Sequence, residues 1–211
     1  MTTVVLLHGW GFDASLWDAV RARLPARLSV TALDFGFFGE ERLKVGAGET
    51  ALAVGHSLGA LWWLVQSDMP WRRLLCINGF PRFTETDDFA PAVAPRVLSR
   101  MRQQFQRDPA GVLTDFHARC GGHAPTGAPN AARLAAGLGW LAEWDGRATL
   151  AARRSDVVAL AGAHDPIVPA AMSAMAFGAE GAVEFIDAPG HLLPLTHPEV
   201  CADWIERLTN A

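Results

Sequence analysis

Residues 51–64, ALAVGHSLGALWWL, carry a single hydroxyl, Ser57, between two glycines. A strand-like apolar run precedes the serine, and a helical pattern follows it. In the pattern G-x-S-x-G, a sharp strand-to-helix turn exposes the serine Oγ, and the bare glycines let the backbone fit. The segment therefore predicts a nucleophilic serine. The alternative is a glycine-rich turn that contains a serine by chance.

A serine nucleophile requires a base, and the base requires a carboxylate that fixes its tautomer. His191 follows the last strand-like run and the turn Pro189-Gly190, and Asp165 ends the strand-like run before it. The carboxyl ends of parallel strands meet at one sheet edge, where ligands bind. The chain order serine, acid, histidine is one of the known triad orders. We predict a triad of Ser57, Asp165 and His191.

The tetrahedral intermediate of acyl transfer requires amide donors for its oxyanion. We expect one donor to be the amide of Leu58, at the start of the helix after the serine. The second is expected to be the amide of Trp10, in HGWG after the first strand-like run. The Trp10 ring is interpreted as a wall of the site or of an acyl pocket. His8 is interpreted as an anchor of this loop rather than as a catalytic group.

The remaining polar residues near predicted strand ends receive structural interpretations. Asp34 precedes Ser57 in the chain, which breaks the triad order, and is interpreted as a turn cap. Asn78 also ends a strand, but an amide cannot serve as the acid. The side chain of His56 is expected to be directed away from the site. The other histidines receive no role, with surface positions expected for the first two: His117, His123, His164 and His197.

The distribution of apolar residues predicts the fold class. Short apolar runs bounded by turn residues read as strands at 4–9, 28–34, 51–57, 74–79, 156–165 and 183–191. Helical patterns occupy residues 14–24, 58–67 and 198–208. Strands that alternate with helices predict an α/β fold, with a mainly parallel sheet and helices on both faces.

Two connections depart from this alternation. Residues 81–153 contain helical patterns near 92–106, 110–119 and 130–144 but no strand-like run. We expect a helical cap over 81–153, inserted into a core formed by 1–80 and 154–211, in a single compact domain. The crossover at 35–50 is too short for more than a turn or two of helix, and its glycines suggest mobility.

Composition excludes several classes of function. The net charge of −4 offers no attraction for nucleic acid or an anionic membrane surface. No stretch reaches the ~20 apolar residues of a membrane helix. The three cysteines lack the spacing of a zinc site or a disulfide framework, and the N-terminus lacks the features of a signal peptide. We expect a cytoplasmic monomer or weak dimer with no metal and no cofactor.

The combination of HGWG, GHSLG, AGAHDPIVP and APGH resembles the α/β-hydrolase superfamily across nearly the whole chain. The HGWG form and the arginine-bearing cap are most similar to the biotin-synthesis esterases that cleave pimeloyl-acyl-carrier-protein methyl ester. The chain departs from the usual pattern because it begins at the strand before HGWG, without the N-terminal hairpin. The resemblance implies a serine carboxylesterase that acts on a small ester or on an acyl group held by a carrier protein.

Most of the expected substrate contacts come from the cap, and one, Phe80, directly precedes it. Apolar side chains are expected to line the site together with Trp10, and they are Phe80, Met101 and Phe105. Arg96 and Arg100 lie four residues apart on one helical face. They are interpreted either as a docking face for an acidic carrier protein or as a solvated helix surface.

Two further readings of the same sequence remain open. The triad also suits a promiscuous small-ester, lactone or C–C bond hydrolase, and the cap would decide among these substrates. A scaffold that only binds ligands is the non-enzymatic alternative, although such scaffolds usually lose a triad member.

Overall fold

The computed structural model describes residues 2–44, 50–66, 69–178 and 183–210. Its centre is a six-stranded sheet in the order β2-β1-β3-β4-β5-β6, and every neighbouring pair of strands is parallel. The strands are β1 (Thr2–Leu7), β2 (Leu28–Leu33), β3 (Thr50–His56), β4 (Trp71–Ile77), β5 (Val157–His164) and β6 (Val183–Pro189). The six predicted strands and the parallel α/β class are confirmed.

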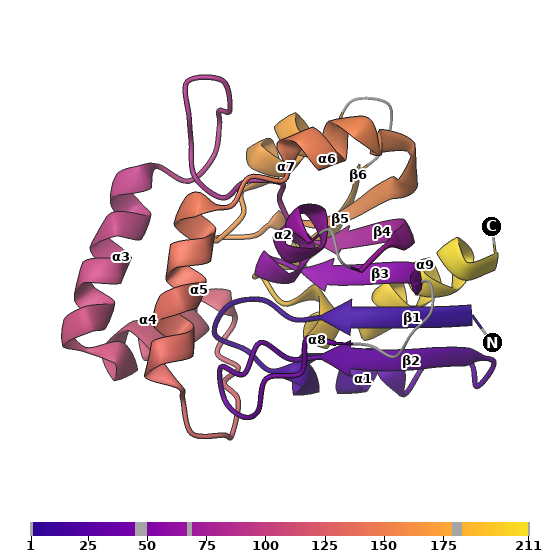
Figure 1. Ribbon diagram of the computed structural model, residues 1–211, viewed down its shortest axis with the longest axis horizontal. Helices are drawn as coiled ribbons and strands as arrows, with labels where there is room; N and C mark the ends of the chain where they lie inside the picture. Colours follow the sequence, from indigo (N-terminus) through magenta and orange to yellow (C-terminus); the bar gives the residue numbers. More distant parts are fainter. Residues whose placement is uncertain (1, 45–49, 67–68, 179–182, 211) are drawn as a thin grey trace.

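Helices cover both faces of this sheet (Figure 1). On one side, η1 (Ala14–Trp17), α1 (Asp18–Arg21) and α8 (Leu193–Thr196) pack around α9 (Pro198–Asn210), which contacts β3 and β4. On the other side, α2 (Leu58–Val65) packs on β3 and β4, and α7 (Ala170–Phe177) covers β5 and β6. The double cover explains why the central strands are continuous apolar runs: Val4 to Leu7 are completely buried.

The chain between β4 and β5 is helical. It contains α3 (Pro95–Arg107), α4 (Pro109–Cys120), α5 (Ala131–Glu143) and α6 (Arg147–Ala152), with the short η2 (Arg154–Asp156) before β5. Figure 1 shows α3, α4 and α5 beyond the carboxyl ends of the strands, whereas α6 lies beside α2. The three helices predicted in this insertion are confirmed. The short helices α6 and α7 were not predicted.

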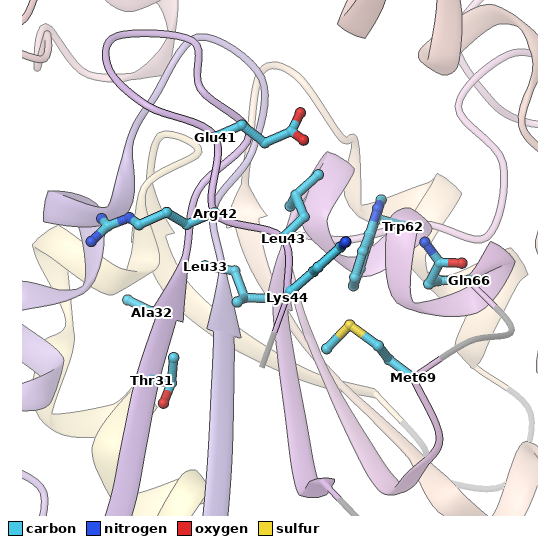
Figure 2. A pocket seen from close by; sticks show the side chains of 10 residues that line it. All are labelled: Thr31, Ala32, Leu33, Glu41, Arg42, Leu43, Lys44, Trp62, Gln66 and Met69. Atoms are coloured by element: carbon cyan, nitrogen blue, oxygen red, sulfur yellow. The ribbon is translucent and has the colours of Figure 1, made fainter. Parts of the chain in front are cut away.

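The crossover from β2 to β3 contains no helix within the described residues 35–44. Asp34 and Arg42 instead form an antiparallel bridge in which each amide donates to the other's carbonyl at 2.9 Å. Without a helix on this part of the sheet, β2, α2 and residues 41–44 enclose a groove of about 810 Å³ (Figure 2). The mobility expected of the crossover at 35–50 stays a prediction, and residues 45–49 of it lie outside the described residues.

No helix within the described ranges is both long enough and apolar enough to cross a bilayer.

The close contact between β1 and α2 generates a first prediction. A Cβ on Gly59 would lie 2.3 Å from the Leu7 carbonyl oxygen, whereas a Cβ on Gly139 in α5 would meet no atom within 4 Å. Alanine stabilises a helix interior by about 1 kcal/mol relative to glycine. We therefore expect Gly139→Ala to raise the free energy of unfolding slightly, and Gly59→Ala to lower it by about 2 kcal/mol or more through overpacking. Urea denaturation measures the free energy of unfolding of both variants. Equal changes in the two variants would contradict the close contact between β1 and α2.

Candidate active site

Ser57 lies at the junction of β3 and α2 in a strained backbone conformation. Its φ is 53° and its ψ is −119°, a combination that residues with a side chain rarely adopt. The turn is tight because a Cβ on Gly55 would lie 2.3 Å from the Ala60 nitrogen. The Ser57 amide donates to the Ile77 carbonyl at 3.0 Å, which ties the turn to β4. This geometry matches the sharp strand-to-helix turn expected for a nucleophilic serine.

His191 and Asp165 form a buried hydrogen bond beside the sheet edge. His191 Nδ1 donates to Asp165 Oδ2 at 2.7 Å, and both side chains are fully buried. Asp165 follows β5, and His191 follows β6 after Gly190, whose φ is +85°. Because Nδ1 carries the proton, Nε2 keeps its lone pair, as a general base requires. Nε2 is buried and has no hydrogen-bond partner within the described part of the chain.

His56 connects this pair to the serine turn. Its Nε2 donates to the His191 carbonyl at 2.8 Å, and the two rings are 4.8 Å apart between centroids. The expectation that the His56 side chain is directed away from the site is therefore wrong. His191 thus lies next to the residue that precedes Ser57. Its Nε2 forms no hydrogen bond to Ser57 Oγ here, and such bonds often tighten only when substrate binds.

Four hydrogen-bond donors surround the Asp165 carboxylate. The amides of Ile167 and Val168 donate to Oδ1 at 2.7 and 3.0 Å, and Asn78 Nδ2 donates to Oδ2 at 2.6 Å beside His191. Burial raises the pKa of Asp165, but the charge and hydrogen bond of His191 and the amides of Val168 and Ile167 outweigh it and hold the pKa below its usual value. The carboxylate is therefore ionised at neutral pH, and it fixes the orientation of the histidine.

The loop after β1 approaches the serine from the other side. A Cβ on Gly9 would lie 2.8 Å from Ser57 Cβ, so the peptide between Gly9 and Trp10 is adjacent to the serine. The Trp10 amide has no hydrogen-bond acceptor among the residues that the structure describes. The Leu58 amide is at the first position of α2, where a helix leaves its N–H groups without intrahelical partners. Both amides are free to bind an oxyanion.

The predicted substrate contacts lie at different depths. The Trp10 ring is buried, its Nε1 donates to the Leu134 carbonyl at 2.8 Å, and it lies edge-on to Phe105 at 6.0 Å between centroids. Met101 is half-buried. Phe80 is fully buried and packs against Phe83.

The two arginines predicted as substrate contacts, Arg96 and Arg100, lie on the exposed side of α3. The structure thus brings Trp10 and Phe105 together and leaves the two arginines at the surface.

The structural roles predicted for other polar residues are partly confirmed. Asp34 accepts hydrogen bonds from the amides of Gly36 and Ala14, which makes it the predicted turn cap. His8 Nε2 accepts from the Phe35 amide at 3.1 Å, as expected of a loop anchor.

Of the two histidines expected at the surface, one is exposed and the other is not. His123 is exposed, as expected. His164, for which no position was expected, is also exposed and lies 3.1 Å from the exposed Asp187 carboxylate. The surface position expected for His117 is wrong. Its ring is buried, and its Nε2 donates to the Gly11 carbonyl at 2.7 Å.

The described residues contain no metal-binding cluster at this site, and the groove shown in Figure 2 lies elsewhere. Within the described ranges, no group of three or more His, Cys, Asp or Glu side chains is arranged to hold a metal ion. The groove of about 810 Å³ is lined by residues such as Leu33, Leu43 and Trp62, and not by the predicted triad (Figure 2). The chemistry is therefore assigned from the hydrogen-bonded side chains and not from this groove.

The chain was compared with known proteins, and no family model matches it. It is 30% identical over a 240-residue alignment to a pimeloyl-[acyl-carrier protein] methyl ester esterase from Xanthomonas campestris pv. campestris, covering 99% of this chain and 95% of that protein. It is 32% identical to the protein of the same name from Aromatoleum aromaticum, over 96% of each chain. The chain belongs to this esterase family.

A solved structure supports the fold of this family member. An esterase from Exiguobacterium antarcticum superposes with a TM-score of 0.80 at 14% identity, covering 100% of this chain and 92% of that one. Its fold, and hence the predicted α/β-hydrolase architecture, is shared. The two esterase relatives also support a hydrolase function for the chain.

Sequence reasoning missed the contacts of three residues near this site, which are His56, Asn78 and His117. Asn78 was recognised at a strand end but not as a donor to Asp165, and His117 received no role. Asn78 has a φ of 47°, a conformation that asparagine tolerates better than most residues, so its position directly after β4 was a usable signal. No local signal identifies His117, because its partner, Gly11, is 106 residues away.

The buried position of His56 predicts a pH dependence of stability. Burial, reinforced by the charge of His191, lowers the pKa of His56 from 6.5 to about 3. Between these values the unfolded chain binds one more proton than the folded chain at residue 56, so stability falls as the pH falls. In His56→Gln, which keeps a donor but does not titrate, the slope of the unfolding free energy against pH is expected to be smaller by about 1.4 kcal/mol per pH unit between about pH 5.5 and 4.

Urea denaturation across this pH range measures both slopes, and His123→Gln, at an exposed histidine, is the matched control. A His56→Gln slope that equals the wild-type slope would show that residue 56 is protonated in the folded chain.

Proposed function

We propose that the chain is a serine carboxylesterase that acts through an acyl-enzyme on Ser57. One observation carries the proposal: His191 donates from Nδ1 to Asp165 at 2.7 Å, so that its buried Nε2 keeps a lone pair next to the serine elbow. An imidazole held in this tautomer by an ionised carboxylate is the base that a serine hydroxyl requires. The esterase names of the relatives support the same class of reaction.

The proposed reaction has two halves. Ser57 Oγ attacks the ester carbonyl carbon while His191 Nε2 accepts its proton, and the Trp10 and Leu58 amides hold the resulting oxyanion. The intermediate collapses to the acyl-enzyme, and His191 protonates the departing alkoxide to give the alcohol. Water then gives a proton to His191 and attacks the acyl carbonyl. The second intermediate releases the carboxylic acid, and the proton returns to Ser57.

We further propose that residues 81–153 form a cap that selects the substrate, and that the substrate is an acyl ester on an acidic carrier protein. In this insertion, Arg82, Arg133 and Arg147 are paired with carboxylates. Arg96 and Arg100 are exposed and form no ion pair within the described part of the chain. Exposed cations without a local partner can steer an anionic protein toward the site. A methyl ester of a pimeloyl group, as in the names of the relatives, fits this proposal.

Covalent labelling tests the proposed nucleophile. A fluorophosphonate probe is expected to label the wild-type chain at Ser57, with one label per chain, whereas Ser57→Ala takes up no label. Turnover of p-nitrophenyl acetate should fall by about 10⁴-fold or more in Ser57→Ala and in His191→Ala. Mass spectrometry of the labelled peptide identifies the site. A folded wild-type chain that takes up no label would refute the serine mechanism.

Steady-state kinetics test the carrier-docking surface. For a carrier-bound pimeloyl methyl ester at low salt, Arg96→Ala combined with Arg100→Ala is expected to raise KM about 10-fold, with little change in kcat. The KM for p-nitrophenyl acetate should stay the same, and the difference between the enzymes should shrink at high salt. Alanine at Arg21 and Arg23, two exposed arginines at the end of α1, is the matched control. Equal KM values for both double variants would refute the docking surface.

A further inference from the structure

Two hydrogen bonds attach the loop that carries the Trp10 amide to the helical insertion, one through a side chain and one through the backbone. In the first, Trp10 Nε1 donates to the Leu134 carbonyl of α5 at 2.8 Å. In the second, the carbonyl of Gly11, the residue after Trp10, accepts from His117 Nε2 of α4 at 2.7 Å. Gly11 has a φ of +75°, and a Cβ placed on it would lie 3.1 Å from the Phe116 ring. The loop is therefore pressed against α4 and anchored to it.

The same end of α4 also contacts the loop of the proposed base. The carbonyl of Cys120, the last residue of α4, accepts from the His191 amide at 3.3 Å. A Cβ on Gly190 would lie 3.0 Å from the same carbonyl oxygen. One helical turn of the insertion, from Phe116 to Cys120, thus contacts the loop of the proposed oxyanion donor and the loop of the proposed base.

The contact of His117 is suited to holding a loop in place. The ring is buried, which lowers its pKa, so that it is neutral at neutral pH and donates from Nε2 as a single tautomer. A buried carbonyl that loses its donor must find another partner or move toward water. The Gly11 carbonyl and the Trp10 amide belong to adjacent residues, with a single peptide unit between the two groups. A rotation of the peptide that carries the Gly11 carbonyl therefore displaces the amide.

We propose that His117 is a positioning residue for the oxyanion hole. By donating to the Gly11 carbonyl, it fixes the Trp10 amide at the distance from Ser57 that the oxyanion requires. This inference rests on the proposed function, because it assumes that Ser57 is acylated. It assigns to the insertion a direct part in the chemistry, in addition to selection of the substrate.

A pair of isosteric variants separates the hydrogen bond from packing. His117→Gln keeps an N–H donor at a similar reach, whereas His117→Met has the same length and no donor. His123→Met, at an exposed histidine in the loop after α4, is the control. Each protein is treated with a fluorophosphonate under pseudo-first-order conditions. The final stoichiometry counts the folded sites, and the rate constant of the labelled fraction measures how well the hole stabilises the phosphonyl oxygen.

Loss of one oxyanion donor costs about 10²–10³-fold in rate, so a displaced donor in His117→Met should slow labelling by at least about 10-fold. The labelling rate of His117→Gln should stay within about 3-fold of wild type, and that of His123→Met should not change. For turnover of p-nitrophenyl acetate, the kcat values of the variants should follow the same order as their labelling rates, with similar KM values. If the wild type is labelled but the Gln and Met variants have equal rate constants, the proposed role of His117 is overturned and the proposed function is not. A wild type without label would instead refute the proposed function.

Discussion

Ser57 adopts a backbone conformation that costs on the order of 1–3 kcal/mol for a residue with a side chain, and it persists only because its surroundings leave no alternative. The backbones of three segments, which are β1 with the loop after it, β3 and α2, are in close contact at this turn. A Cβ on Gly59 would collide with the carbonyls of β1, and a Cβ on Gly9 would collide with Ser57 itself. The position of the hydroxyl is thus set by main-chain packing between β1, β3 and α2, and not by the side chain's own preference.

The polar groups beside the serine follow the order of the strands. Neighbouring strands β3, β4, β5 and β6 contribute His56, Asn78, Asp165 and His191 at or just after their carboxyl ends. The carboxylate accepts from Asn78 and His191, and His56 holds the backbone of His191. Each buried group restricts the next, so the imidazole is oriented from several directions. Three buried atoms of this network have no hydrogen-bond partner within the described residues, namely His56 Nδ1, Asn78 Oδ1 and His191 Nε2. An unpaired polar group is costly at low dielectric, so these atoms are the points at which the network can accept a further partner.

The sequence allowed prediction of those parts that depend on local pattern. The six strands and the ends that carry Ser57, Asp165 and His191 follow from apolar runs bounded by turn residues, and three helices around the sheet follow from the helical patterns at 14–24, 58–67 and 198–208. Helix α7, AAMSAMAF, was missed because its residues are nearly all apolar or small and give no amphipathic period. The contacts of His56, Asn78 and His117 were missed for a different reason. Their partners are between 87 and 135 residues away, and only the assembled fold brings them together.

Helix α3 shows why the triad alone does not define the substrate. Its buried side places Phe105 against the Trp10 ring, which is tied to the loop beside Ser57, while its exposed side presents Arg96 and Arg100. Residues on the buried sides of the insertion are constrained by these contacts, because a change there would move the loop that carries the proposed oxyanion donor. Residues on the exposed sides carry no such constraint. Under the proposed function, substrate preference can therefore change through the exposed side of the insertion while the buried side keeps the geometry of the proposed site, in line with the general rule that one fold hosts many functions.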